Sequence, residues 1–309
     1  MASISIAKKR RRLTLSHREA VWAYALISPW LIGFIVFTAG PMIASLYFSL
    51  TEYDVINPPR FIGLANWRSM FAEDPLFWHS LKVTLMYAVA ALPLGLVLGL
   101  ALALLLNAEV PGLMFWRTIY YMPSVVSGVA VAVLWSYVFN PRFGILNWLL
   151  SLVGIKGPGW LSSTDWALPA MIIMSLWGVG GGMITYLAGL QGIPTALYEA
   201  ATIDGATKWQ RFWRITLPLI TPVIFYNLVT GIIGAFQYFT AAYVMTNGGP
   251  ANATLFYNLY LYRNTFRYGR LGFGSTMAWF LLFVVMVMTM LIFRSSAVWV
   301  YYEGELKKE

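Results

Sequence analysis

Six long apolar segments constrain the fold of this chain more than any other feature of its sequence. They cover roughly residues 22–48, 83–106, 116–139, 167–190, 217–245 and 272–293 of a chain of 309 residues. A helix needs about 20 mostly apolar residues to cross the hydrocarbon core of a bilayer, and each segment is long enough. Only 11% of the residues are charged, against about 25% in a soluble domain. The sequence therefore predicts an all-α membrane protein with six transmembrane helices.

The two ends of the chain are polar, which divides it into three parts. Residues 1–20 form a basic segment that includes Lys8-Lys9-Arg10-Arg11-Arg12. Such a run can bind nucleic acid, but beside an apolar segment it more commonly holds a terminus in the cytoplasm, so we expect no nucleic-acid partner. We expect a six-span domain over residues 21–300 and a cytoplasmic tail over 301–309.

The first apolar segment is a retained membrane anchor rather than a cleaved leader. It runs from Val21 to Leu50, whereas the apolar core of a signal peptide has about 7–15 residues. It is also longer than the bilayer requires, and Gly40-Pro41 interrupts it. We expect this helix to tilt, or to kink and protrude.

The distribution of Lys and Arg predicts the orientation. One side collects the basic N-terminal run, Arg117, the three bases of residues 208–214 and the bases from Arg294 onward. The other side has fewer, and Lys and Arg favour the cytoplasmic side of a membrane. We therefore expect both termini and residues 191–216 in the cytoplasm.

The predicted spans contain no source of energy for transport. All 12 acidic residues lie outside them, whereas a carrier driven by protons or sodium usually keeps an ionisable residue near the bilayer centre. Backbone carbonyls could still bind sodium. The chain has no G-x-x-x-x-G-K-[ST] phosphate-binding loop, no metal-ligand cluster and no catalytic triad. We expect neither enzymatic activity nor a cofactor in this chain, so energy for uphill transport must come from another subunit.

A charged, helix-prone segment at about residues 194–216, here called the knuckle, separates the fourth and fifth apolar segments. Pro194 is suited to the first turn of a short helix, and Gly205 is expected to end it. A second helix is expected over residues 206–215, with Trp209, Phe212 and Trp213 on one apolar face and Lys208, Arg211 and Arg214 beside it. Pro218 and Pro222 are expected to stop this helix where the fifth span begins.

The knuckle has two interpretations from its residues alone. Four small residues, Ala200, Ala201, Gly205 and Ala206, would let another protein's backbone approach closely, and Glu199 offers an anion to a basic group. The knuckle would then be a docking element. Alternatively, it is an ordinary amphipathic loop that lies in the membrane interface.

The knuckle resembles the EAA loop of the permeases of ABC importers. The resemblance rests on Glu199-Ala-Ala, Asp204-Gly205-Ala206, Phe212, Ile215, Leu217-Pro218 and Pro222, with apolar spans on both sides. Further stretches resemble the carbohydrate-uptake branch of that family, the maltose-permease-like inner-membrane components. They are "FIGLANW" (61–67), "FNPRFGILN" (139–147), "YLAGLQGIP" (186–194) and "TNGGP" (246–250).

The resemblance implies a function and a set of partners. The chain would be a permease subunit with the type I ABC importer fold in a bacterial or archaeal cell membrane. It would work with a second, homologous permease, two ATP-binding subunits that hold ATP and Mg²⁺, and an extracytoplasmic solute-binding protein. Residues 199–201 and 204–206 would dock on an ATP-binding subunit, with Glu199 as the polar contact and Gly205 as the sharp turn. The aromatic face would anchor the knuckle to the permease's own cytoplasmic ends.

The fourth and fifth spans contain candidate residues for a solute path. Asn227, Thr230, Gly231, Gly234 and Tyr238 fall on one helix face, with Gln237 at its margin. Gly178-Val-Gly-Gly-Gly182 follows Trp177 in the fourth span and either loosens the helix beside a cavity or forms a packing notch. By resemblance to the maltose permease these regions line the path, although this chain lacks its asparagine-rich pattern. The candidates are Ser175, Trp177, Gly182, Asn227, Gly231, Gly234, Gln237 and Tyr238.

Other interpretations remain open at this point. The glycine stripe would also serve close helix packing. The solute could be glycerol phosphate or a polyol rather than a sugar. An ion-coupled carrier and a purely structural anchor are disfavoured by the missing intramembrane charges and by the polar helix faces, respectively.

The predicted orientation can be tested by labelling single cysteines, because the chain has no native cysteine. Residues 51–79, 140–166 and 246–271 should react with an impermeant maleimide added to intact spheroplasts. A cysteine at position 207 should react only after the membrane is opened. Labelling of position 207 from outside would contradict the whole arrangement.

Overall fold

The computed structural model describes residues 15–108 and 111–301. The predicted basic run at residues 8–12 and nearly all of the predicted tail lie outside the described residues.

Helices account for all six predicted spans. Four of the spans are helices without a sharp bend, and two are pairs of shorter helices. The first four comprise α1 (Leu15–Phe34), a π-helical turn (Ile35–Ala39) and α2 (Gly40–Ser49); α4 (Pro75–Leu106); α11 (Lys208–Arg211), a π-helical turn (Phe212–Thr216) and α12 (Leu217–Phe236); and α14 (Leu271–Trp299). The pairs are α5 (Leu113–Val125) with α6 (Gly128–Val138), and α8 (Thr164–Leu176) with α9 (Gly180–Gln191).

The third span is not the single helix that its hydropathy predicts. The axes of α5 and α6 differ by 99°, and Val126 and Ser127 between them are extended. Pro123 lies in the last turn of α5 and has no N–H to donate. Residues 126–127 are as apolar or small as their neighbours, so a hydropathy profile does not detect the bend.

The fifth span also differs from its prediction at both ends. It ends at Phe236 rather than near residue 245, although the residues that follow are apolar. At its start, Pro218 and Pro222 do not stop a helix, because the helix continues from Lys208 to Phe236. A π-helical turn at Phe212–Thr216 precedes Pro218, and the Leu217 N–H bonds to the Phe212 carbonyl five residues back. The wider turn is a known way to absorb an irregularity in a helix.

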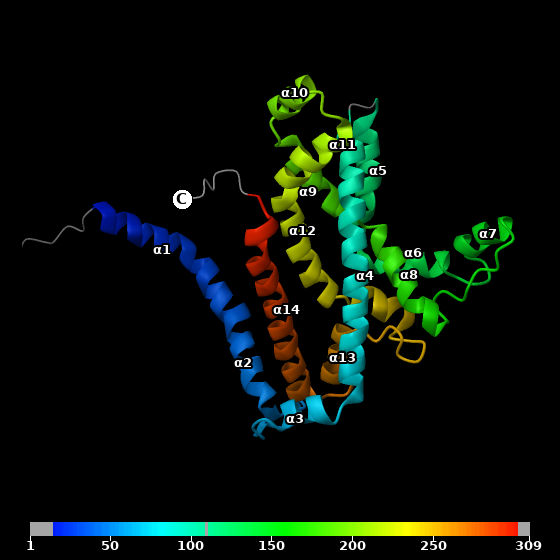
Figure 1. Cartoon of the computed structure of the whole chain (residues 1–309). Coiled ribbons are helices and arrows are strands. Elements are labelled where there is room, and N and C mark those ends of the chain that lie inside the picture. The colour runs from blue at the N-terminus through cyan, green and yellow to red at the C-terminus, as the bar shows by residue number, and fades with distance from the viewer. Residues whose placement is uncertain (1–14, 109–110, 302–309) are drawn as a thin grey trace, which may run out of the picture.

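The first span leaves the bundle along its N-terminal half. Figure 1 shows α1 diverging from α14 while α2 stays beside it. No residue of α1 is buried. In contrast, Thr276 Oγ1 of α14 donates to the Ser49 carbonyl (3.0 Å), and Trp279 Nε1 donates to Ser45 Oγ (3.1 Å). Of the expected alternatives, the structure shows the N-terminal half of this span diverging from the bundle.

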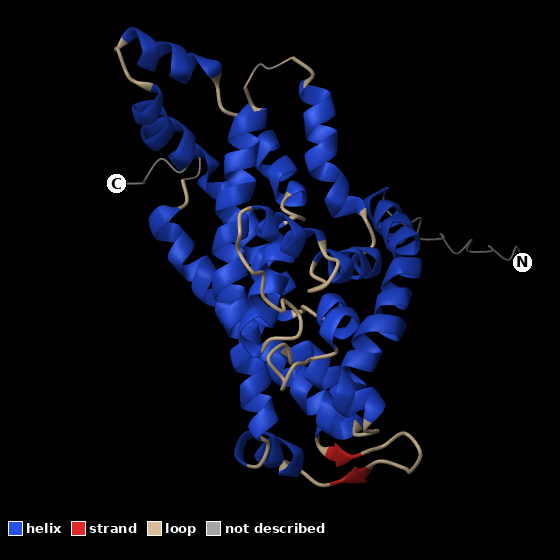
Figure 2. Cartoon of the chain, turned by 90° about the vertical axis from the view of Figure 1, so that its right-hand side faces the viewer, coloured by secondary structure: helices blue, strands red, loops and turns tan. Residues whose placement is uncertain are grey.

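Helix α4 is central to the bundle and contacts α8, α9, α12 and α13 (Tyr257–Tyr262), while α14 packs on α2 and α12. The knuckle and the α14 C-terminus lie toward one end of the bundle, and α3 lies at the other (Figure 1). Small elements complete that other end and the connections. They are β1 (Thr51–Glu52), β2 (Arg60–Phe61), α3 (Ala65–Ala72), α7 (Ile145–Leu152), α13 (Tyr257–Tyr262) and two π-helical turns (Ala242–Thr246 and Arg263–Arg267). The two strands form an antiparallel hairpin that is visible in Figure 2.

The motifs outside the membrane spans stabilise turns. Asn66 of "FIGLANW" donates to the Ser49 carbonyl (3.2 Å) and the Thr51 carbonyl (2.8 Å), which ties α3 to the end of the first span. Asn147 of "FNPRFGILN" accepts a bond from the Trp160 indole N–H (2.7 Å). These motifs therefore hold the connections between spans in place.

Candidate functional site

The knuckle projects from one end of the bundle. Its first arm is α10 (Thr195–Ile203), which begins directly after Pro194 and has no buried residue. Gly205 has a φ of 77°, a conformation that favours glycine, so the predicted break in the helix is confirmed. The second arm starts at Lys208, two residues later than predicted, after a capping box formed by Thr207 and Gln210.

The predicted coupling residues lie on the outer part of the knuckle. Glu199, Ala200, Asp204 and Gly205 are exposed, while Ala201 and Ala206 are partly buried. A surface of small side chains with two carboxylates, Glu199 and Asp204, is therefore exposed on the described chain. Figure 1 shows α10 at the extreme end of the molecule, clear of the spans.

Two hydrogen bonds hold the knuckle in shape. The Arg211 guanidinium donates to Thr202 Oγ1 (2.9 Å), which joins the second arm to the first. The hydroxyls of Tyr198 and Thr216 are 3.0 Å apart and join α10 to the start of the fifth span. The first arm is therefore tied directly to the start of the fifth span.

The expected anchoring role of the aromatic face is wrong. Trp209, Phe212 and Trp213 pack on one another, with centroid distances of 5.3–5.8 Å. Trp209 remains 68% exposed and Trp213 51% exposed. Tyr198 and Ile215 pack instead against the buried cluster that contains Leu190, Ile193 and Ile220, and they anchor the knuckle.

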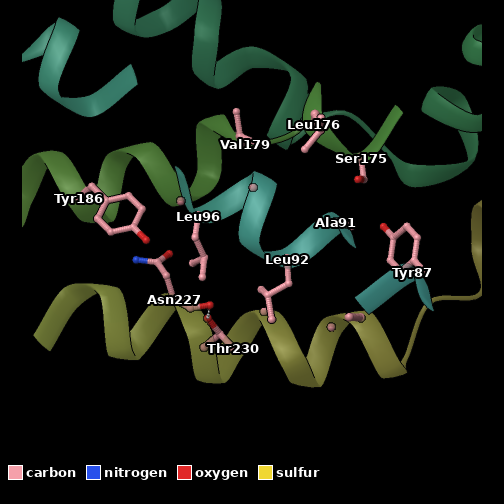
Figure 3. A pocket seen from close by; sticks show the side chains of 15 residues that line it. Tyr87, Ala91, Leu92, Leu96, Ser175, Leu176, Val179, Tyr186, Asn227 and Thr230 are labelled. Carbon is pink, nitrogen blue, oxygen red and sulfur yellow. Dashed lines mark hydrogen bonds between the residues drawn. The ribbon is translucent and has the colours of Figure 1, made fainter. Parts of the chain in front are cut away.

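A cavity of about 330 Å³ lies between α4, α8, α9 and α12. Five candidate path residues line it, namely Ser175, Gly182, Asn227, Gly231 and Gly234. Tyr87, Leu92, Tyr186 and Thr230 also contribute to its walls, as Figure 3 shows. The sequence therefore predicts residues from the fourth and fifth spans that line the same cavity.

A second cavity, of about 370 Å³, shares Ser175 and Gly234 with the first. Trp177, Gln237 and Tyr238 line it, so all eight candidate path residues border one cavity or the other. The rings of Tyr87 and Tyr238 are in contact, with a centroid distance of 4.4 Å. Because Tyr87 borders the first cavity and Tyr238 the second, this aromatic pair lies where the two meet.

Three interruptions of the spans border the second cavity. Its lining includes Pro123 and Gly128 beside the break of the third span, and Trp177 and Gly178 at the break of the fourth. Gln237 through Ala241, which follow the end of α12, complete it. Non-helical backbone at membrane depth is tolerated where it lines a cavity or is buried in protein. The breaks in the three spans are therefore gathered around this cavity.

Asn227 bridges two helices. Its amide nitrogen donates to Thr185 Oγ1 (2.9 Å) and to the Val223 carbonyl (2.9 Å), and its amide oxygen accepts from Thr185 Oγ1 (3.0 Å). The Tyr186 ring points toward Asn227 across the cavity in Figure 3. The Tyr186 hydroxyl is buried and has no hydrogen-bond partner among the described residues.

The candidate glycines have different surroundings. A Cβ on Gly231 would lie 2.3 Å from Leu92 Cδ1, and one on Gly180 would lie 2.0 Å from the Tyr120 carbonyl oxygen. A Cβ on Gly234 would meet nothing within 4 Å. Gly180 and Gly231 thus serve close packing, whereas Gly234 leaves space at both cavities.

The sequence does not predict Tyr87 and Tyr186 as residues that line the cavity. Tyr87 lies in the second span, in a stretch without a polar stripe. Tyr186 lies in "YLAGLQGIP", a stretch that indicates the family but not a cavity. Both are aromatic residues within otherwise aliphatic helices. That pattern alone does not separate a cavity wall from a packed core.

Comparisons with known proteins identify the family. Residues 91–300 match the family described as "Binding-protein-dependent transport system inner membrane component". This chain belongs to that family. It is a multi-pass membrane protein and the permease component of a transport system, which agrees with the predicted type I permease fold.

Relatives and solved structures match nearly the whole chain. The chain is 43% identical to the "Probable ABC transporter permease protein YesP" of Bacillus subtilis, with 96% of each covered. It is 36% identical to the trehalose/maltose transport system permease protein MalF of Thermococcus litoralis, with 85% of this chain and 90% of the relative covered. A permease chain in the crystal structure of a bacterial alginate ABC transporter, in complex with an alginate pentasaccharide-bound periplasmic protein, superposes with a TM-score of 0.82. That chain is 28% identical, with 93% of this chain and 97% of the other covered.

The two glycines of the fifth span provide a test of the cavity. Gly231→Leu should lower the thermal stability of the purified protein by about 1–3 kcal/mol, because the new side chain overlaps Leu92. Gly234→Leu should keep its stability, because the site is open, yet should reduce solute uptake by filling the junction of the cavities. Thermal unfolding in detergent and uptake of labelled solute measure the two effects. Equal destabilisation by both substitutions would assign the whole stripe to helix packing.

Proposed function

We propose that this permease takes up a sugar or oligosaccharide, as one of two homologous membrane subunits of an ATP-driven importer. The observation that carries the choice of solute is the lining of the two cavities. It combines tyrosine, asparagine, glutamine, serine and threonine side chains with small residues and contains no charged side chain. Such a surface suits a neutral solute with many hydroxyl groups. The names of the similar trehalose/maltose and alginate transport proteins support a saccharide, and the first of them supports a neutral one, because alginate is acidic.

The lining disfavours glycerol phosphate. A phosphate group is usually bound by Arg or Lys, or by backbone N–H groups at a helix N-terminus. No base borders either cavity. A polyol has the same hydroxyl groups as a sugar, but it lacks the flat apolar face of a pyranose ring. Tyr238 and Tyr87 offer aromatic surfaces for such a face.

Energy would enter through the knuckle. Glu199, Ala200, Ala201, Asp204, Gly205 and Ala206 are assigned to the contact with an ATP-binding subunit, which would hold ATP and Mg²⁺. Two such subunits are expected, so a second permease must supply the second knuckle. In this assignment the knuckle and both termini are cytoplasmic. The family's dependence on a binding protein supports a solute-binding protein on the opposite side, at the end that carries α3.

An ion-coupled carrier and a structural anchor fit the geometry less well. In the described residues, the cavities contain no ionisable carboxylate, histidine or base that could carry a coupling ion. An anchor would require neither the two cavities nor a projecting α10.

The coupling role predicts the effect of two substitutions in the knuckle. Glu199→Lys reverses one of the two acidic charges on the small-residue surface, and Gly205→Asp places a side chain where φ is 77°. Each should cost the docking contact a few kcal/mol and lower binding-protein-stimulated ATP hydrolysis and uptake together. The assembled importer in proteoliposomes is the sample in which both rates are measured.

Glu19→Lys is the matched control, because Glu19 is an exposed acid on α1, outside the knuckle. This variant should transport normally. Normal ATP hydrolysis and normal uptake in both knuckle variants would refute the docking role.

A further inference from the structure

The aromatic face of the second arm of the knuckle is largely exposed and has no partner outside that arm among the described residues. Trp209 and Trp213 are 68% and 51% exposed, and Phe212 is partly buried beneath them. Neither indole N–H donates a hydrogen bond among the described residues, whereas those of Trp78, Trp160, Trp279 and Trp299 do. Two large amphipathic rings are therefore presented together on the outside of a helix.

The position of these rings is fixed by the helix that carries them. The helix runs from Lys208 to Phe236 without a sharp bend, so the second arm is the direct extension of a membrane span. At about 1.5 Å per residue, Trp213 lies about 6 Å and Trp209 about 12 Å before Leu217, where the apolar run begins. The headgroup layer on each side of a bilayer is about 5–8 Å thick. Trp213 therefore lies at headgroup depth, and Trp209 lies a few ångströms outside the headgroup layer.

Basic side chains flank the two rings. Lys208 precedes Trp209 and Arg214 follows Trp213, and each is exposed. At about 100° per residue these two bases fall on opposite sides of the tryptophan pair. Arg211 instead donates to Thr202 within the knuckle and is less available. A helix with tryptophan on one face and bases on both flanks complements an apolar boundary covered by negative charge.

We propose that the second arm of the knuckle binds the headgroups of anionic phospholipids through Lys208 and Arg214, with Trp213 inserted among them. We assign lipid rather than a protein as the partner of this face, because the same helix continues into the bilayer. The indole N–H groups supply donors to phosphate or ester oxygens, and the rings lie beside the upper acyl chains. Lipid would thereby hold the arm that connects α10 to the fifth span.

The binding test uses the assembled importer in detergent, titrated with phosphatidylglycerol or with phosphatidylcholine and followed by native mass spectrometry. Each base near an anionic surface contributes about fivefold in affinity. Lys208→Gln combined with Arg214→Gln should therefore weaken phosphatidylglycerol binding about thirtyfold and leave phosphatidylcholine binding unchanged. The matched control is Arg142→Gln combined with Lys156→Gln, two exposed bases that precede and follow α7, and it should retain the wild-type preference. Equal losses in both pairs, or a loss in neither, would overturn the proposal.

A second measurement places the rings and does not depend on the charge variants assembling. Brominated phosphatidylglycerol in nanodiscs should quench a component of the tryptophan fluorescence that Trp213→Phe removes and Trp209→Phe removes less. If Trp213 were instead unquenched by lipid and shielded by the ATP-binding subunit, the aromatic face would be a protein contact and the proposal would be wrong. Both readouts are independent of solute and ATP, so they stand apart from the test of the proposed function.

Discussion

Backbone hydrogen bonding in a bilayer is the constraint on which the rest of this structure depends. Every N–H and C=O in hydrocarbon must be paired, so a chain that breaks its helices must hide the breaks from lipid. Three spans of this permease are broken or end early, at Val126–Ser127, at Trp177–Val179 and after Phe236. All three interruptions border one cavity. The same requirement that dictates helices elsewhere therefore concentrates irregular backbone where a solute would pass.

One helix connects that cavity with the knuckle. The helix from Lys208 to Phe236 begins beside α10, continues past Asn227 and Gly234, and ends where Gln237 and Tyr238 enter the cavity wall. The π-helical turn at Phe212–Thr216 keeps it continuous past Pro218. The Tyr198–Thr216 hydrogen bond attaches α10 to its start. In the proposed function, a displacement of α10 would reach the cavity wall through this one helix.

Much of the fold follows from the sequence, because apolar length decides which segments span a membrane. The six spans and the turn at Gly205 were predictable on that basis and from the backbone freedom of glycine. The length of an apolar segment does not indicate the direction of the helix axis or where the helix ends. The 99° bend in the third span and the end of the fifth span at Phe236 were therefore not predicted. Pro218 was predicted to stop the helix, but the π-helical turn at Phe212–Thr216 accommodates the proline and the helix continues. The prediction that Trp209 and Trp213 anchor the knuckle is wrong, because helical spacing shows only that residues share a face and does not show what packs against that face.

In the candidate site too, sequence spacing shows which residues share a helix face, but the packing around each residue determines its role. Asn227, Gly231 and Gly234 share a face by spacing alone, but their roles differ. Asn227 pairs with Thr185 and joins α9 to α12, and Gly231 admits Leu92, so both hold the wall together. Gly234 keeps space open.

The cavity wall includes one polar group that the protein itself leaves unpaired. The Tyr186 hydroxyl is buried without a partner among the described residues, and leaving such a group unpaired costs about 1–3 kcal/mol. In the proposed function, a state that opens the wall to water or to a hydroxyl-rich solute would satisfy this hydroxyl and offset part of the cost of opening.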